Sequence, residues 1–187
     1  FTVAQSIADN KASVIYHCLQ RMFKYGTSVL HNINDEYIFQ FNKIYKKAAN
    51  EAHFYIEILR FNENANGFLT ARIEPDNNII YMIIDHFNDR LHCENFLIYD
   101  VRRNIAYIHM NNNTAFFYND YNNELLKQLD DFSDNENDIQ NLWIRFYNTI
   151  AIKERVNYKC QINMLPLKYR KYLPELPIKK GIPPNNN

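Results

Sequence analysis

The stretch from residue 153 to residue 182 holds the densest group of anion-binding side chains in this sequence. Eight basic residues stand there beside two acidic ones, and Tyr158, Tyr169 and Tyr172 are interleaved with them. Lysine and arginine contact phosphates and tyrosine rings stack on bases, so this pattern favours nucleic-acid binding. A second interpretation stays open on spacing alone: the segment docks on the acidic linker predicted at residues 130–138, or it is a solvated face.

An acidic stretch opposes this basic one. Residues 120–138 carry seven acidic side chains and one basic side chain, a net charge of −6, whereas residues 153–182 carry a net charge of +6. The whole chain has 21 Lys+Arg and 21 Asp+Glu, a formal net charge of zero. A neutral total argues against a globally basic nucleic-acid coat and against a strongly acidic tail protein, but it leaves room for a local patch.

A second group of basic side chains lies in the middle of the chain. His86 and Arg90 are four residues apart in a predicted helix over residues 79–91, so they share one face. Such a pair grips a phosphate or carboxylate, or it forms a structural hydrogen-bonded pair. Arg102 and Arg103 fall in a predicted hairpin loop, where binding groups are common, although a plain solvated loop is an equal alternative. These four residues form a second candidate anion-binding cluster.

Acid/base chemistry is also conceivable. Glu51 and His53 are two residues apart on a predicted helix, so they point to opposite edges and cannot form a dyad with each other. If the protein is an enzyme, His53, Asp76 and His86 are the acid/base groups that would converge, with Arg60 or Arg103 holding a phosphate.

Several chemistries lack their motifs in this sequence. There is no P-loop, GxGxxG, HExxH or GxSxG pattern, and three glycines are too few for a glycine-rich phosphate cradle. The three cysteines have neither zinc spacing nor a disulfide framework, so no metal and no cofactor is expected. No run of about 18 apolar residues exists, which excludes a membrane span, and no leader pattern is present, which favours the cytoplasm. Because the chain begins with Phe1 rather than Met, we expect residues to precede it.

The elements that must position these residues follow from periodicity and turn signals. Helices are predicted over residues 9–26, 35–59, 79–91, 124–129 and 139–152. Strands are predicted over residues 68–74, 96–99, 105–110 and 115–118, with a turn at 62–67 and an acidic linker at 130–138. We therefore expect an α+β class, with helices flanking a small, mostly antiparallel sheet of about three strands. One domain is expected over residues 1–187, with a helical part at 1–61, an α+β core at 62–152 and a basic, proline-interrupted segment at 153–187.

Three stretches together resemble a known family. They are EAHFYIEILRF (residues 51–61), then TARIEPDNNII, DHFNDRL and FLIYDVRRNIA (residues 70–106), then LWIRFYNTIAIKERVNYKCQINMLPLKYRKYLPEL (residues 142–176). This order resembles a bacterial family of unknown function known as probable DNA metabolism proteins. Four arginines fall on its motif positions: Arg60, Arg90, Arg103 and Arg155.

The resemblance implies partners as well as a function. The family's C-terminal domain also occurs fused to uracil-DNA-glycosylase-like domains, and its members are commonly encoded beside a radical-SAM protein assigned to DNA modification or repair. This chain has no glycosylase motif and no iron–sulfur cysteines, so those activities would belong to the partners. The leading hypothesis is a DNA-metabolism or repair accessory protein that binds DNA or a nucleotide. Its expected contacts are Arg155, Lys168, Tyr169, Arg170 and Lys171, with the cluster of His86, Arg90, Arg102 and Arg103 as a second site.

Two rival hypotheses stay open beside this one. The first is the enzyme described above, whose substrate would be a nucleotide or a damaged base. The second is an adaptor that docks a radical-SAM or glycosylase-like partner and touches no DNA itself.

Overall fold

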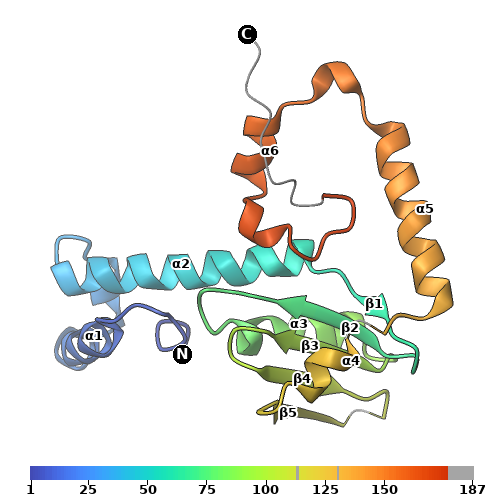
Figure 1. Ribbon diagram of the computed structural model, residues 1–187. Coiled ribbons are helices and arrows are strands. Elements are labelled where there is room, and N and C mark those ends of the chain that lie inside the picture. Colours follow the sequence, from blue (N-terminus) through green and yellow to red (C-terminus); the bar gives the residue numbers. More distant parts are fainter. Residues whose placement is uncertain (113, 130, 177–187) are drawn as a thin grey trace.

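The computed structural model describes residues 1–112, 114–129 and 131–176, in which six α-helices and a five-stranded sheet form an α+β fold (Figure 1). The helices are α1 (Lys11–Tyr25), α2 (Glu36–Ile58), α3 (Ile80–Arg90), α4 (Glu124–Gln128), α5 (Asp134–Ile150) and α6 (Tyr158–Met164). The strands are β1 (Asn62–Glu63), β2 (Leu69–Ile73), β3 (Phe96–Asp100), β4 (Ile105–His109) and β5 (Ala115–Asn119). Short 3₁₀ turns lie at η1 (Thr27–His31), η2 (Lys153–Arg155) and η3 (Leu167–Tyr169).

The sheet is larger than the sequence predicts: it has five strands, not about three. The strand order is β1-β2-β3-β4-β5, and every neighbouring pair is antiparallel except β2 and β3, which are parallel. Helix α3 makes the crossover that a parallel pair requires. Strand β1 lies where a turn was predicted, because a two-residue strand shows no alternation and is defined only by its pairing with β2.

Alternation along the strands builds a core on each face of the sheet. Phe96 and Ile98 of β3 pack with Ile83 of α3 and with the C-terminal half of α2 in the larger core. Leu97 and Tyr99, which point the other way, pack against residues in and beside α4. The sheet therefore lies between α2 and α3 on one side and α4 on the other, as Figure 1 shows.

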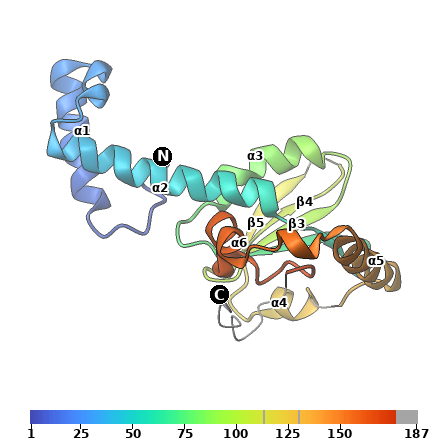
Figure 2. The same cartoon turned by 90° about the horizontal axis from the view of Figure 1, so that it is seen from above.

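The N-terminal helices form an arm that projects from this body. Helix α1 packs on the N-terminal half of α2 through a small separate core that includes Val14 and Ile44, and both lie away from the sheet (Figure 2). The predicted start of α2 is confirmed, because the Asp35 carboxylate accepts hydrogen bonds from the backbone N–H groups of Tyr37 and Ile38. Gly26 ends α1 with a positive φ of 79°, a conformation that suits glycine.

Helix α5 begins earlier than predicted and includes most of the residues that were expected to form an acidic linker. The Ser133 side chain caps it by accepting a hydrogen bond from the backbone of Glu136, so the linker prediction is wrong from residue 134 onward. The Glu136 carboxylate accepts a bond from the backbone N–H of Glu63 at 3.1 Å, which fastens the start of α5 to β1. In the part of the chain that the structure describes, no helix combines the length and apolar character needed to cross a membrane.

Candidate functional site

The carboxyl ends of β2 and β3 meet at one edge of the sheet because these two strands are parallel. Asp76 and Asn77 follow β2, Asp100 ends β3, and Glu51 reaches the same place from α2. In open α/β sheets this edge is where ligands commonly bind. The polar residues gathered here, with the C-terminal residues that contact them, are called the carboxylate cluster below.

Glu51 is the buried centre of the carboxylate cluster. Its carboxylate, in a residue that is only 5% exposed, accepts hydrogen bonds from the backbone N–H of Asp76 at 2.9 Å and of Asn77 at 2.8 Å. It also accepts a bond from the Asn77 side-chain amide at 2.6 Å. The side-chain amide oxygen of Asn77 in turn accepts a hydrogen bond from the backbone N–H of Ile7. One carboxylate thereby joins α2, the loop after β2 and the N-terminal segment.

Cations from two further segments satisfy the exposed side of the carboxylate cluster. Lys168 Nζ lies 2.8 Å from one Asp76 carboxylate oxygen, and an Arg102 nitrogen lies 2.9 Å from the other. The hydrogen bond from Lys168, helped by Arg102, holds the pKa of Asp76 below its usual value despite partial burial. Arg103 donates to the fully buried Asp100 at 2.8 Å, but burial dominates and raises the pKa of Asp100.

A further carboxylate, that of Glu74, binds the C-terminal segment in the same way as Asp76. Both the Lys171 ammonium and the Tyr172 hydroxyl donate to Glu74, directly after β2. Burial alone would raise the pKa of Glu74, but these two donors outweigh it and lower that pKa. Lys168 and Lys171 of the basic segment therefore pair with acids of the same chain, but not with those of the acidic linker that the sequence suggested. Those acids come from α2 and the end of β2 rather than from residues 120–138, and every carboxylate of the cluster has a cationic partner.

Beside the carboxylate cluster lies an open depression of about 390 Å³, called the cationic hollow below. Arg60, which follows α2, lines it together with Arg72 of β2 and Lys171. Among the described residues of its lining, none is acidic. Its hydrogen-bonding and aromatic groups are Asn62, Thr70, Gln140, Phe132 and Tyr172.

The short strand β1 explains why Arg72 reaches this hollow. Strand β1 pairs only with Leu69 and Thr70, so the edge of β2 beside Arg72 lies beyond the end of β1. Alternation turns Arg72 away from Ile73, which is buried in the larger core. The guanidinium thus points to the side where Lys171 and Tyr172 lie.

A smaller depression of about 200 Å³ adjoins the cationic hollow and shares Arg60, Asn62, Gln140 and Pro174 with it. We call it the Trp143 hollow. The Arg60 guanidinium lies 5.0 Å from the centroid of the Trp143 ring and also contacts Glu175, with a nitrogen–oxygen distance of 3.0 Å. Arg60 follows α2, Trp143 lies in α5 and Glu175 lies in the C-terminal segment, so only the tertiary structure brings them together.

The predicted acid/base residues have different surroundings. His53 is exposed on α2, with its Nε2 3.2 Å from a carboxylate oxygen of Glu57 one turn later. His86 is exposed on α3 and lies edge-on against the ring of Phe87, whereas Asp76 belongs to the carboxylate cluster. The described contacts do not join the three residues, and the acid/base trio stays a prediction. Within the described residues, no group of three His, Cys, Asp or Glu side chains could hold a metal ion.

The predicted anion-binding residues lie in several different surroundings. Arg60 and Lys171 line the cationic hollow, and Arg90 and Arg155 are exposed elsewhere. Lys168, Arg102 and Arg103 are engaged in the carboxylate cluster, while Tyr169 packs against Phe54 and Tyr55.

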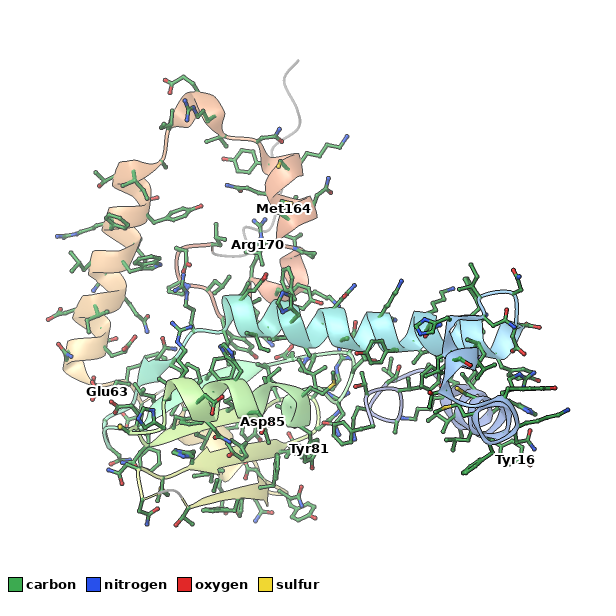
Figure 3. All side chains as sticks on the ribbon, turned by 180° about the vertical axis from the view of Figure 1, so that it is seen from behind. Tyr16, Glu63, Tyr81, Asp85, Met164 and Arg170 are labelled. Carbon is green, nitrogen blue, oxygen red and sulfur yellow. The ribbon has the colours of Figure 1, made fainter. Side chains whose placement is uncertain are left out.

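Arg170 differs from all of these because it is buried. It is 8% exposed, donates to the backbone oxygen of Leu165 at 2.9 Å, and lies beside α6 above the end of α2 (Figure 3). We therefore do not propose it as a contact for a ligand. Lys179 and Lys180 lie outside the described residues.

Sequence reasoning missed Arg72, although one signal could have found it. Arg72 is the charged residue at an alternating position of a predicted strand, which marks the face opposite the core. The alternation in the sequence does not indicate which distant residues share that face with Arg72.

The fold and site define an α+β domain in which a neutralised carboxylate cluster holds the C-terminal segment beside an open cationic hollow. The chain belongs to the family DUF4130, a domain of unknown function, whose model matches residues 9–175. That range includes every residue that lines the two hollows. No curated protein and no solved structure matches the chain.

Proposed function

We propose that this protein is a DNA-metabolism accessory protein that binds nucleic acid and holds a phosphate group in the cationic hollow. The observation that carries the proposal is the lining of that hollow: Arg60, Arg72 and Lys171 with no acidic residue among the described ones. Arginine binds phosphate through paired N–H groups, and several cations around one depression favour a polyanion. A volume of about 390 Å³ lies within the range of small-ligand pockets.

The family resemblance supports the DNA-metabolism context. Each of its three stretches contributes to the walls of the two hollows: Arg60 from the first, Arg72 from the second, and Trp143 with Glu175 from the third. The carboxylate cluster holds one wall of the cationic hollow in place, because its ion pairs hold Lys168 and Lys171 against the sheet. The proposed contacts therefore shift from the whole basic segment to the groups that face the hollow.

Salt-dependent binding tests the proposal. Fluorescence anisotropy with a labelled oligonucleotide should show affinity that falls steeply between about 50 and 200 mM salt, since each phosphate contact releases roughly one counterion. Arg60→Gln and Lys171→Gln should each weaken binding and reduce the salt slope by about one. Lys46→Gln, at an exposed site on α2 outside both hollows, is the matched control and should change neither.

Two outcomes would contradict the proposal. The first is no binding of single- or double-stranded DNA at about 50 mM salt. The second is a double variant, Arg60→Gln with Lys171→Gln, that binds as tightly as the wild type. Because both residues also form ion pairs, thermal melts and circular dichroism must show that each variant is folded, and Arg60→Lys tests charge separately from shape.

The adaptor hypothesis has one observation in its favour, the exposed apolar stripe along α5. Ile139, Leu142, Phe146 and Ile150 follow helical spacing and are 50 to 67% exposed. A radical-SAM or uracil-DNA-glycosylase-like protein could dock there. Co-purification with such a protein should then fail for Leu142→Asp and survive Lys171→Gln, whereas the opposite pattern would exclude α5 as the docking surface.

A further inference from the structure

The cationic hollow and the Trp143 hollow are neighbours that meet at Arg60. They share Arg60, Asn62, Gln140 and Pro174, yet their chemistry differs. The first is lined by cations, whereas the second is lined by the ring of Trp143 and by carboxylates. A ligand that fills both must therefore be anionic at one end and flat, apolar and hydrogen-bonding at the other. A nucleotide unit has these properties.

The aromatic end offers rings on which bases could stack. Trp143 is 36% exposed and Phe146 is 50% exposed, and their ring centroids lie 5.8 Å apart with an interplanar angle of 34°. Arg60 covers part of Trp143, which adds a cation beside the ring. Aromatic rings along a positively charged groove are the arrangement that binds single-stranded nucleic acid.

Glu175 gives an independent indication of a ligand in the Trp143 hollow. Its side chain is 6% exposed, and one carboxylate oxygen accepts from Arg60. The other oxygen, Oε2, is buried and has no hydrogen-bond donor in the described part of the chain. A buried acceptor normally has a partner. Phosphate oxygens cannot donate to it, but the N–H groups on the edge of a nucleobase can.

From these observations we infer that the two hollows together bind an unpaired nucleotide of single-stranded nucleic acid. Its phosphate lies among Arg60, Arg72 and Lys171, its base stacks on Trp143, and an N–H of the base edge donates to Glu175 Oε2. In a duplex the base faces are stacked and the pairing edges are occupied, so double-stranded nucleic acid is disfavoured. The inference rests on the proposed function and specifies its ligand.

The sequence supplies a direct reporter, because Trp143 is the single tryptophan of the chain. Titration with a mixed-sequence single strand of DNA or RNA should change the intrinsic tryptophan fluorescence. Inorganic phosphate and an abasic strand of the same length should not, because they have no base to stack. Single strands should bind about tenfold or more tightly than the matching duplex, within the range that base stacking on an aromatic ring supplies.

Two variants isolate the stacking contact. Trp143→Leu should weaken single-strand binding about 10- to 100-fold in anisotropy, a much larger loss than for the duplex. Trp143→Phe, which keeps an aromatic ring, should restore most of the affinity. DNA and RNA share the chemistry used here, so a preference for either single strand over the duplex supports the inference.

The failure of this inference is distinguishable from the failure of the proposed function. Equal affinity for duplex and single strands, with tryptophan fluorescence and the Trp143→Leu variant unaffected, overturns the single-strand inference while phosphate binding stands. Absence of binding to every nucleic acid at about 50 mM salt overturns both.

Discussion

Removal of the Glu51 carboxylate is the sharpest test of the architecture that positions the site. In Glu51→Gln, the amide oxygen can still accept both bonds from Asn77, but the amide nitrogen then faces the backbone N–H of Asp76. That N–H loses its acceptor, and Lys168 loses a carboxylate at 3.7 Å. A buried donor without a partner costs about 1–3 kcal/mol, so we expect Glu51→Gln to destabilise the fold by about 2 kcal/mol.

Glu51→Ala removes all three hydrogen bonds at once and should cost about 3–5 kcal/mol, the range seen when one partner of a buried charged network is deleted. Urea unfolding followed by circular dichroism measures both values. For a chain of this length, a loss of 2 kcal/mol corresponds to a fall in Tm of roughly 4–8 °C.

Glu57→Gln is the matched control for this test. Glu57 lies on the same helix and pairs with His53, but the two side chains are 58% and 74% exposed, so a change below about 0.5 kcal/mol is expected. A Glu51→Gln variant within about 0.5 kcal/mol of the wild type would refute the reasoning.

Three further predictions concern pH and the core. The hydrogen bond from Lys168 chiefly keeps the pKa of Asp76 low, so the Asp76 carboxylate stabilises the fold above about pH 4 and this stabilisation is lost as the pH falls. Asp76→Asn should therefore reduce the shift of the urea midpoint between neutral and acidic pH. Burial and Asp120 raise the pKa of Tyr99 to about 12, so the stability that the neutral Tyr99 contributes is lost as the pH rises from about 10 toward 12. Tyr99→Phe should remove this loss of stability at high pH and should destabilise the fold by about 1–2 kcal/mol at pH 7. Ile83 is fully buried on α3, so Ile83→Ala should cost about 3 kcal/mol in urea unfolding and Ile83→Val about 1 kcal/mol.

Local patterns in the sequence identify most of the regular structure. The apolar arc over residues 35–59 predicts α2, and the structure confirms it at Glu36–Ile58. The hairpin of β3 and β4 is likewise confirmed, with the turn between them that carries Arg102 and Arg103. These elements are predictable because their periodicity and end signals lie within a few residues of one another.

Predictions from the sequence fail where an element depends on distant partners or where its cap lies within a run of acidic residues. Strand β1 exists because Asn62 pairs with Thr70. Helix α5 starts at Asp134 because the Ser133 side chain accepts a hydrogen bond from the backbone N–H of Glu136. A serine N-cap is readable in the sequence, but this one lies within a run of acidic residues.

The candidate site depends on contacts that cross most of the chain. The sequence shows a basic C-terminal segment, but not that Lys168 meets Asp76, 92 residues earlier, or that Arg60 meets Glu175, 115 residues later. An ion pair has no sequence periodicity, because it forms wherever packing brings opposite charges within reach. The charge pattern along the chain therefore could not show which cations pair with internal carboxylates, or which cations line the open hollow.

The sequence by itself determined the α+β class, the main helices, the hairpin and the dipolar distribution of charge. These features follow from residue types and their spacing along the chain. Only the tertiary structure decided which cations lie together, because the parallel pairing of β2 and β3 and the short β1 place Arg60, Arg72 and Lys171 around one hollow. Within the neutral total charge, the structure thus shows two features. The carboxylate cluster, in which acids and cations are paired, holds the C-terminal segment, and the cationic hollow lies beside it.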